Sequence, residues 1–383
     1  MADDCHAGDS GADGAFVERP RAPRWARLCV LLGLLLMLAS GGVLVAAEAL
    51  ISRYEGSVGK ADLFGDQAAG ATQRPVNITG PLNILLVGID PRAADSDTPP
   101  LADSILILHV PAGLDRAYLF SLPRDLIVDI PRFDKARYLG GTDRLNAAMA
   151  YGSHVPGRVK PDATRGFELL SMTISNYTGI KRFDAGAIIN FTGFRRLVDA
   201  MGGVTMYVDA ETRSEHRRPD GRPRPNDPDG EGYVGPQAVY EKGRQHLEGW
   251  QALDYLRQRK SLADGDYGRQ RHQQQFIKAM VDRAFGRNVV TNPVRLDAVL
   301  RSAGRSLIFN GRGNSIADFG FALRGIRSDA IMMIKLSGVG VAEDGEYRGE
   351  RLEPPARQFF THLAAGRIDT FVAAHPDVLN RHR

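Results

Sequence analysis

Two aspartates stand at the ends of short apolar runs that have the composition of buried strands. Asp90 follows residues 82–87 (LNILLV), and Asp103 immediately precedes residues 104–110 (SILILHV). If these runs are neighbouring strands, both carboxylates lie close together at one edge of a sheet. Hard oxygen ligands of this kind suit Mg²⁺, which keeps several waters and binds substrate phosphate at its remaining positions. The alternative is that Asp90 caps a turn and Asp103 is a solvated loop residue, because aspartate is common at turns.

Arginines follow a third apolar run and recur later in the chain. Residues 117–122 (AYLFSL) lead into a proline that ends a strand ladder and can present Arg124 at the sheet edge. A surface ion pair between Arg124 and Asp125 is the simpler interpretation. A YLRQR segment further along adds two more arginines, Arg257 and Arg259.

A helix that starts near Arg269 has a mixed inward face. One stripe of this helix carries Arg269 and Gln273, followed by Phe276, Ile277 and Met280. The apolar part is typical of a core helix, whereas the first turn places an arginine and a glutamine where apolar residues are expected. Buried polar groups must be paired, so these two either meet protein acceptors or line a site for an anion. A solvated helix end is the third interpretation.

The composition excludes several kinds of site. The only cysteines are Cys5 and Cys29, so the chain after them has no thiol for catalysis, zinc binding or a disulfide. The net charge is +4, and arginine far outnumbers lysine. Arginine suits phosphate recognition, although a G+C-rich genome also enriches it. The sequence has no basic tail or stripe of the kind that binds nucleic acid.

One uncharged segment, residues 28–47, is long enough to cross a hydrocarbon core of about 30 Å as a helix. Four arginines crowd its N-terminal side: Arg19, Arg21, Arg24 and Arg27. This bias predicts that residues 1–27 form a cytoplasmic tail and that everything after the anchor lies outside the membrane. A cleaved signal peptide is the alternative, with a weak cleavage site at residues 46–48. Residues 48–80 are predicted to form an extracellular stalk.

Strand-like and helix-like patterns alternate after the stalk, which predicts an α/β fold, a three-layer α/β/α domain with a central mixed sheet. Residues 211–235 are rich in Pro, Gly, Arg and Asp and are predicted to form a mobile surface loop. The other predicted elements are helices at 144–151, 163–178 and 191–201, helical patterns from 249 and from 269, and strands at 204–208 and 330–336.

Six motifs in one order resemble the LytR–CpsA–Psr family over about residues 82–285. They are NILLVGIDPR, ADSILILHV, SLPRD, DRLNAAMAYG, LVDAMGGV and LEGWQALDYLRQRKSLADGDYGRQRHQQ. The resemblance implies a catalytic domain over residues 81–383 with a C-terminal helical extension. It also implies a membrane-anchored, Mg²⁺-assisted phosphotransferase that works outside the cell. Such enzymes move a glycopolymer from a polyprenyl diphosphate carrier in the membrane lipid onto peptidoglycan. A hydrolase of the same diphosphate and a non-catalytic envelope regulator are the alternatives.

The same resemblance assigns roles to single residues. Asp90 and Asp103 match the carboxylates that hold Mg²⁺, and Asp266 matches an acid that orients an arginine. Arg144 stands where the family commonly has lysine, and Leu101 stands where many members have an arginine. The residues that match contacts or neighbours of the diphosphate are Arg92, Arg124, Arg257, Arg259, Arg269 and Gln273. An apolar slot for the prenyl chain is expected between the sheet and the helices.

Overall fold

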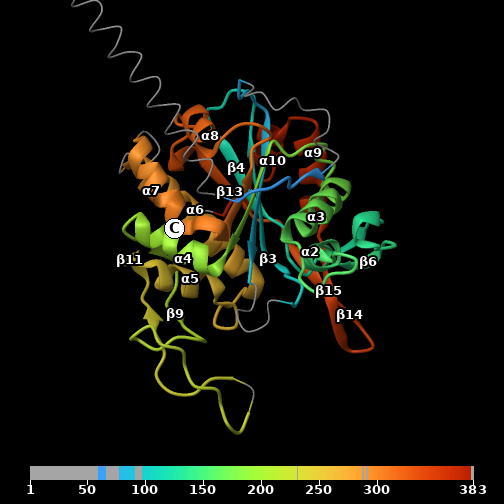
Figure 1. Cartoon of the computed structure of the whole chain (residues 1–383). Helices are drawn as coiled ribbons and strands as arrows, with labels where there is room; N and C mark the ends of the chain where they lie inside the picture. Colours follow the sequence, from blue (N-terminus) through green and yellow to red (C-terminus); the bar gives the residue numbers. More distant parts are fainter. Residues whose placement is uncertain are drawn as a thin grey trace, which may run out of the picture. The chain divides into compact units, whose positions relative to one another are not determined.

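A mixed seven-stranded sheet lies at the centre of the described part of the chain (Figure 1). The computed structural model describes residues 59–65, 77–90, 97–230, 232–286, 289 and 292–380. In sheet order the strands are β1 (Gly59–Lys60), β12 (Leu307–Asn310), β7 (Ala185–Asn190), β2 (Leu82–Ile89), β3 (Ala102–Val110), β4 (Ala117–Ser121) and β13 (Ile331–Ile334). β3 is antiparallel to both neighbours, whereas β2 is parallel to β7 and β4 is parallel to β13. The predicted α/β fold with a central mixed sheet is therefore confirmed.

Helices cover both faces of this sheet because its central strands are apolar on both sides. On β2, Leu85 and Val87 face one core and Ile84 faces another. The first core also receives side chains from α2 (Leu145–Ser153), α3 (Ala163–Thr178), α9 (Pro354–Ala364) and α10 (Ile368–Ala374). The second receives side chains from α6 (Gly265–Gly286) and α8 (Ile316–Ala322). In Figure 1, α2 and α3 accordingly lie on the opposite side of the sheet from α6.

Smaller elements surround the sheet. Helices α4 (Phe191–Ala200), α5 (Gly249–Arg257) and α7 (Pro293–Ala303) complete the α6 side. Four two-stranded pairs are described: β5 (Ile127–Ile130) with β6 (Gly141–Arg144), β8 (Val204–Val208) with β11 (Gly243–Leu247), β9 (Thr212–Arg213) with β10 (Val239–Tyr240), and β14 (Gly338–Glu343) with β15 (Glu346–Leu352). Local chemistry sets several helix starts: Asp162 caps α3 and Asn190 caps α4 through side-chain bonds to backbone N–H groups.

A bulge at the edge of the sheet places Asp103. Gly88 pairs with Ser104 and Ile89 pairs with Ala102, so Asp103 is the extra residue on β3. A bulge of this kind re-aims a side chain and ends regular pairing, and bulges are frequent next to active sites. Asp90 directly follows β2 at the same edge. The predicted proximity of the two strand ends therefore follows from the register.

The segment 211–235 is a loop, as the sequence predicts, but one with an organised interior. The buried guanidinium of Arg224 donates hydrogen bonds to the backbone carbonyls of Glu215, Tyr233 and Gly235. The C-terminal helices α9 and α10 are packed into the sheet's own core through Phe359 and Phe371. The predicted tail (1–27), membrane anchor (28–47) and most of the stalk (48–80) lie outside the described residues. Among the helices that are described, none combines the length and the apolar character of a membrane span.

Candidate active site

Arg124 and Asp103 form the ion pair at the centre of the candidate site. Nη1 of Arg124, just beyond β4, donates to Oδ1 of Asp103 at 2.5 Å, and each side chain is 25% exposed. Nε of Arg124 is buried and has no hydrogen-bond partner among the described residues, and it lies 3.8 Å from Oδ2 of Asp125. Burial works to lower the pKa of Arg124, but Asp103 and Asp125 outweigh it and raise that pKa. Arg124 is therefore a fixed cation.

Arg269 is the most deeply buried cation of the site. The residue is 8% exposed, and its Nη2 lies 2.6 Å from Oδ1 of Asp266 one helical turn earlier on α6. Burial lowers the pKa of its guanidinium, Asp266 opposes that effect, and the positive charges of Arg124 and Arg259 lower the pKa further. Three arginines therefore share one electrostatic environment.

The buried donors of these arginines are incompletely satisfied by protein. Nε of Arg269, like Nε of Arg124, has no hydrogen-bond partner within the described structure. An unpaired buried donor costs about 1–3 kcal/mol, and more when it is charged. Two such donors in one environment, close to like charges, indicate a site that an anion completes.

The first turns of α6 are attached to the sheet beside Asp103. Oγ of Ser104 donates to Oε1 of Gln273 at 2.8 Å. The buried Gln274 donates to Oγ of Ser121 and to the carbonyl of Ile334 at 3.1 Å each. The polar start of α6 is thus packed against the sheet beside Asp103 and is not a solvated helix end.

Asp90 forms a second carboxylate–arginine pair. Its Oδ2 lies 3.5 Å from Nη2 of Arg257, and both side chains are 33% exposed. The Arg257 guanidinium also lies 4.4 Å from the ring centre of Phe191, at the start of α4, a cation–π contact that fixes its plane. The α5 end therefore supplies a cation to the strand edge.

The remaining predicted residues have different positions. Arg144 donates to the backbone carbonyls of Tyr347 and Arg348 at 3.0 and 2.8 Å, and its Nη1 lies 3.9 Å from Asp125. It joins the site to the β14–β15 hairpin, so its role beside the diphosphate stays a prediction. Leu101 is 42% exposed immediately before β3. Arg92 lies outside the described residues.

Asp209, at the end of β8, is a residue that sequence reasoning missed. It accepts hydrogen bonds from Nε of Arg271 at 2.7 Å and, on its other oxygen, from Nε2 of the fully buried His272 at 3.0 Å. Burial works to raise the pKa of Asp209, but the contacts with His272 and Arg271 hold it well below its usual range. Asp209 thereby attaches α6 to the end of β8. Its partners lie 62 and 63 positions away, so no local pattern could have identified it.

The donor set at the strand edge suits a magnesium ion. Asp90 and Asp103 are partly exposed carboxylates at adjacent strand ends. Within the described residues no group of three or more His, Cys, Asp or Glu side chains could hold a metal. Two carboxylates are nevertheless the usual protein share for Mg²⁺, whose other ligands are water and substrate phosphate.

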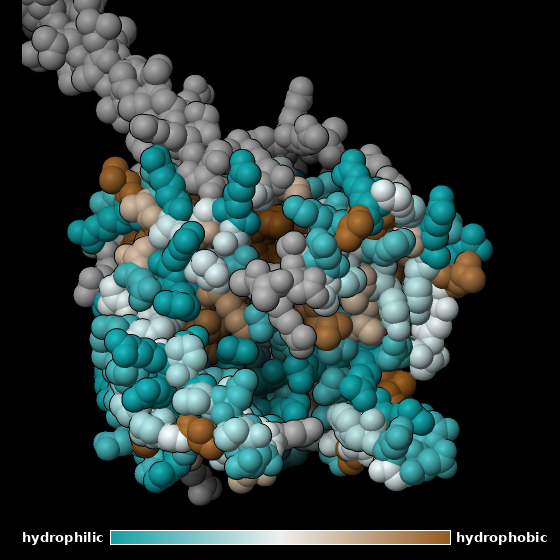
Figure 2. Space-filling model, turned by 60° about the horizontal axis from the view of Figure 1, so that its bottom comes forward, coloured by the Kyte–Doolittle hydropathy of each residue, from teal (hydrophilic) through white to brown (hydrophobic). Residues whose placement is uncertain are grey.

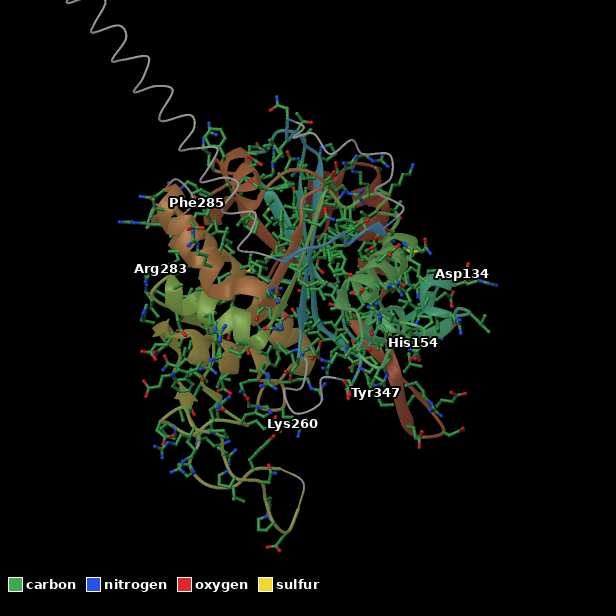
Figure 3. All side chains as sticks on the ribbon, in the orientation of Figure 1. Asp134, His154, Lys260, Arg283, Phe285 and Tyr347 are labelled. Atoms are coloured by element: carbon green, nitrogen blue, oxygen red, sulfur yellow. The ribbon has the colours of Figure 1, made fainter. Side chains whose placement is uncertain are left out.

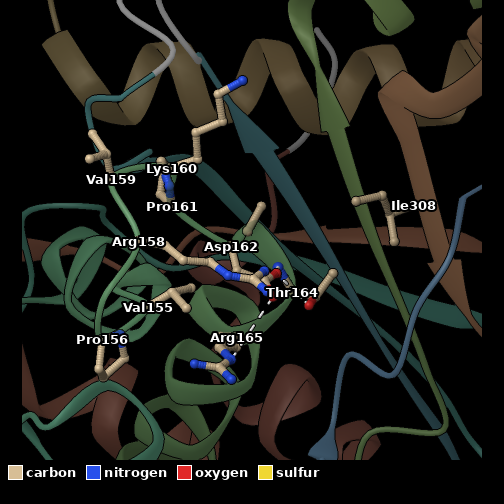
Figure 4. A pocket seen from close by; sticks show the side chains of 11 residues that line it. Val155, Pro156, Arg158, Val159, Lys160, Pro161, Asp162, Thr164, Arg165 and Ile308 are labelled. Carbon is tan, nitrogen blue, oxygen red and sulfur yellow. Dashed lines mark hydrogen bonds and ion pairs between the residues drawn. The ribbon is translucent and has the colours of Figure 1, made fainter.

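The hydrophilic end of the molecule is seen in Figure 2, where polar residues gather on the face turned forward. Tyr347 and Lys260 lie at this end in Figure 3, on the hairpin and on the α5–α6 connection. A separate cavity of about 860 Å³ lies at the α2–α3 connection, lined by Arg158, Lys160 and Asp162 among others (Figure 4). None of the predicted site residues lines it.

An α/β domain that gathers several arginines and two carboxylates at its strand ends has the residue types that suit a phosphorylated ligand. Comparison with known proteins gives the particular family. The chain belongs to the LytR_cpsA_psr (LytR–CpsA–Psr) family, whose sequence model matches residues 55–364. The resemblance derived from the six motifs is therefore confirmed.

Relatives and solved structures agree with this assignment. An Enterococcus faecalis protein named polyisoprenyl-teichoic acid–peptidoglycan teichoic acid transferase TagU is 28% identical over 275 residues, covering 72% of this chain and 76% of its own length. Biofilm regulatory protein A of Streptococcus mutans is 27% identical over 301 residues, covering 77% and 66%. The chain spans about half, 53%, of TagU from Oceanobacillus iheyensis, which is 29% identical over 55% of this chain. The crystal structure of Bacillus subtilis TagV has the same fold, with a TM-score of 0.54 at 20% identity over 76% of this chain and 98% of that one.

Proposed function

We propose that this protein transfers a glycopolymer from a polyprenyl diphosphate carrier onto peptidoglycan. The observation that carries the proposal is the pair of buried Nε donors of Arg124 and Arg269, for which the described residues supply no hydrogen-bond partner. The two oxyanions of a diphosphate supply the acceptors that these donors require. The names of the TagU relatives independently point to the same class of substrate, a glycopolymer linked to a polyisoprenyl carrier.

The reaction is an attack by a sugar hydroxyl of peptidoglycan on the phosphorus nearest the polymer. A new P–O bond forms to the acceptor, the bridging P–O bond breaks, and polyprenyl phosphate leaves. Arg124, Arg257, Arg259 and Arg269 meet the negative charge that spreads over the phosphoryl oxygens. The hydroxyl proton passes to a carboxylate at the strand edge, Asp90 or Asp103.

Mg²⁺ held by Asp90 and Asp103 would neutralise part of the diphosphate charge. Each carboxylate also lies beside its own arginine and tempers that positive charge. Asp266 orients Arg269 through their ion pair. These roles divide the site into residues that contact phosphate and acids that hold the contacts in place.

The prenyl chain extends along the α6 face of the sheet. Leu86 and Leu108 are half-buried on this face, and Ile277 of α6 packs against the same core. Gly88, which has no side chain, and Ser104 follow on the same face, nearer the strand ends that carry the site. Apolar surface that leads from a diphosphate site towards the sheet interior suits a lipid tail.

The proposed location is outside the membrane, with residues 28–47 as an uncleaved anchor and the N-terminus in the cytoplasm. The four flanking arginines support this orientation. Reporter fusions after Ala47 and near Arg383 test it, and both are expected to report an external location.

Product analysis tests the reaction. The full-length protein is incubated with a defined prenyl-diphosphate glycan and peptidoglycan fragments, and polymer bound covalently to the fragments is measured. Transfer by the wild type that is lost in Arg269→Ala supports the proposal. Release of free polymer phosphate without attachment would instead identify a hydrolase.

A further inference from the structure

Three tyrosines lie close to residues 143 and 144: Tyr138 and Tyr151 on the α2 side of the sheet, and Tyr347 on the β14–β15 hairpin. Tyr347 of β15 is 47% exposed and Tyr151 of α2 is 37% exposed. The Tyr151 ring is stacked on that of Tyr138, with ring centres 4.6 Å apart and planes 10° from parallel. Tyr138, Tyr151 and Tyr347 are named the tyrosine strip below. Exposed rings of this kind give a large, rigid, amphipathic contact surface at low entropic cost.

Polar groups connect the members of the strip. Tyr151 donates to Oδ2 of Asp143 at 2.5 Å, and the backbone N–H of Arg144 donates to Oδ1 of the same carboxylate. The Arg144 guanidinium lies 5.3 Å from the ring centre of Tyr347. The strip therefore alternates aromatic rings with a carboxylate and a guanidinium, which are the partners that a sugar ring with several hydroxyls requires.

Two long ion pairs link the strip to the diphosphate site. Arg144 lies 3.9 Å from Asp125, and Asp125 lies 3.8 Å from Arg124. The hairpin that carries Tyr347 is also fixed to α6, because Tyr267 donates to Oε2 of Glu350 at 2.7 Å. A ligand on the strip would therefore reach the reacting phosphorus from a fixed direction.

The side of the sheet on which the strip lies decides which substrate it binds. Tyr138 packs against the core on the α2 face, whereas the apolar surface assigned to the prenyl chain lies on the α6 face. In phosphoryl transfer the attacking and leaving oxygens are roughly in line on opposite sides of the phosphorus. With prenyl phosphate leaving towards α6, the attacking hydroxyl must come from the α2 side.

We infer that the tyrosine strip binds the acceptor glycan strand and directs its hydroxyl at the diphosphate. This inference rests on the proposed function for its direction of attack. It assigns the strip to the acceptor alone, so the donor's own glycopolymer is bound elsewhere.

Direct binding tests the strip without any turnover. Uncrosslinked peptidoglycan glycan strands are titrated into the full-length protein in the absence of donor lipid. Tyr347→Ala and Tyr151→Ala are each expected to weaken binding by about tenfold, as for the loss of one aromatic contact. Tyr347→Phe is expected to bind like the wild type, since it keeps the ring. Tyr207→Ala is the matched control, because Tyr207 is 38% exposed on β8 and belongs to neither site.

Steady-state transfer separates the acceptor from the donor. The strip variants are expected to raise the KM for glycan strands about tenfold and to leave the KM for the prenyl-diphosphate donor unchanged. Equal strand binding by all variants, no strand binding by the wild type, or an effect confined to the donor KM would overturn the inference. Strand binding that depends on the strip in a protein that transfers nothing would refute the proposed function and leave the strip assigned.

Discussion

Oγ of Ser104 on β3 donates a 2.8 Å hydrogen bond to Oε1 of Gln273 on α6, across 169 positions of the chain. The bond has a chemical consequence. Because the amide oxygen of Gln273 is engaged by Ser104, the amide nitrogen with its two N–H groups is the part that can serve a phosphate oxygen. Ser104 also follows the bulged Asp103 directly, so one strand end positions both the carboxylate and the helix that carries Arg269.

Loss of a site arginine is expected to weaken diphosphate binding. Arg124→Ala and Arg269→Ala should each reduce the affinity for a prenyl diphosphate analogue by about 1.5–3 kcal/mol, the range for hydrogen bonds to charged groups. Arg217→Ala is the control, because the side chain of Arg217 donates to the carbonyl of Gly221 within its own loop. Calorimetric titration measures all three. Equal losses would mean a diffuse attraction without a defined site.

Replacement of the strand-end carboxylates should abolish magnesium-dependent transfer. Asp90→Asn and Asp103→Asn are each expected to abolish transfer, because a neutral amide is a poorer Mg²⁺ ligand and the lost charge neutralisation is worth several kcal/mol. Asp125→Asn is the matched control, since Asp125 lies beside Arg124 and Arg144 without standing at the β2–β3 edge. Rates are measured against Mg²⁺ concentration and after chelation. Near-normal, Mg²⁺-dependent transfer by both edge variants would show that these carboxylates are structural.

An arginine at position 101 should add the cation that the family resemblance leads us to expect there. Because Leu101 is 42% exposed, the new charge would lie at the rim of the site. Leu101→Arg is therefore expected to raise analogue affinity by about 1 kcal/mol at low salt and by less at high salt. Val294→Arg, at a position 66% exposed on α7, makes the same charge change elsewhere and should have little effect. Unchanged affinity of Leu101→Arg at both salt concentrations would place residue 101 away from the diphosphate.

Asp209 should affect ligand binding through the position of α6. Asp209→Ala leaves Arg271 and His272 without their shared acceptor, which is expected to cost about 2–3 kcal/mol of stability and also to weaken analogue binding. Asp297→Ala is the comparison, because Asp297 is 9% exposed and pairs with Arg301 within α7. Both variants are compared by thermal unfolding and by titration. Destabilisation of both with unchanged affinity in Asp209→Ala would reduce Asp209 to a purely structural residue.

His109 should make the fold sensitive to acid. Burial lowers the pKa of His109 from 6.5 to about 4, partly opposed by Asp369. Between these values the unfolded chain binds a proton that the native protein does not, so stability falls as the pH drops from about 6.5 to 4. Over this range the free energy of unfolding is expected to fall by about 3 kcal/mol. Denaturant unfolding of the wild type and of His109→Gln, which lacks the titrating group, measures the part of this loss that is due to His109. A stability difference that stays constant over this pH range would contradict the assignment.

The sequence predicts those parts of the site that depend on local pattern. The apolar runs before Asp90 and after Asp103 indicate buried strands, and both residues lie at one sheet edge in the structure. The polar stripe at Arg269 and Gln273 also predicts a helix, and in the structure Arg269 is buried and Gln273 is bonded to the sheet through Ser104. Periodicity is enough for these features because each depends only on neighbours along the chain.

The missing parts depend on contacts between distant segments. The bulge at Asp103 is a property of register, which needs the partner strand β2. Tyr267 and Glu350 meet across 83 positions and fix the hairpin beside the site, and no periodic signal marks either residue. Long-range pairing of polar side chains is decided by tertiary packing, so the sequence could not show which polar residues meet.

Isotope transfer from water tests the central claim most directly. The full-length protein, a prenyl-diphosphate glycan and peptidoglycan strands are incubated in ¹⁸O-labelled water, and the phosphorus-containing products are analysed by mass spectrometry. Transfer to a sugar hydroxyl predicts polymer joined to the strand by an unlabelled phosphodiester, together with unlabelled prenyl phosphate. Polymer phosphate that carries ¹⁸O, with no diester on the strand, would show that water is the acceptor and would contradict the account.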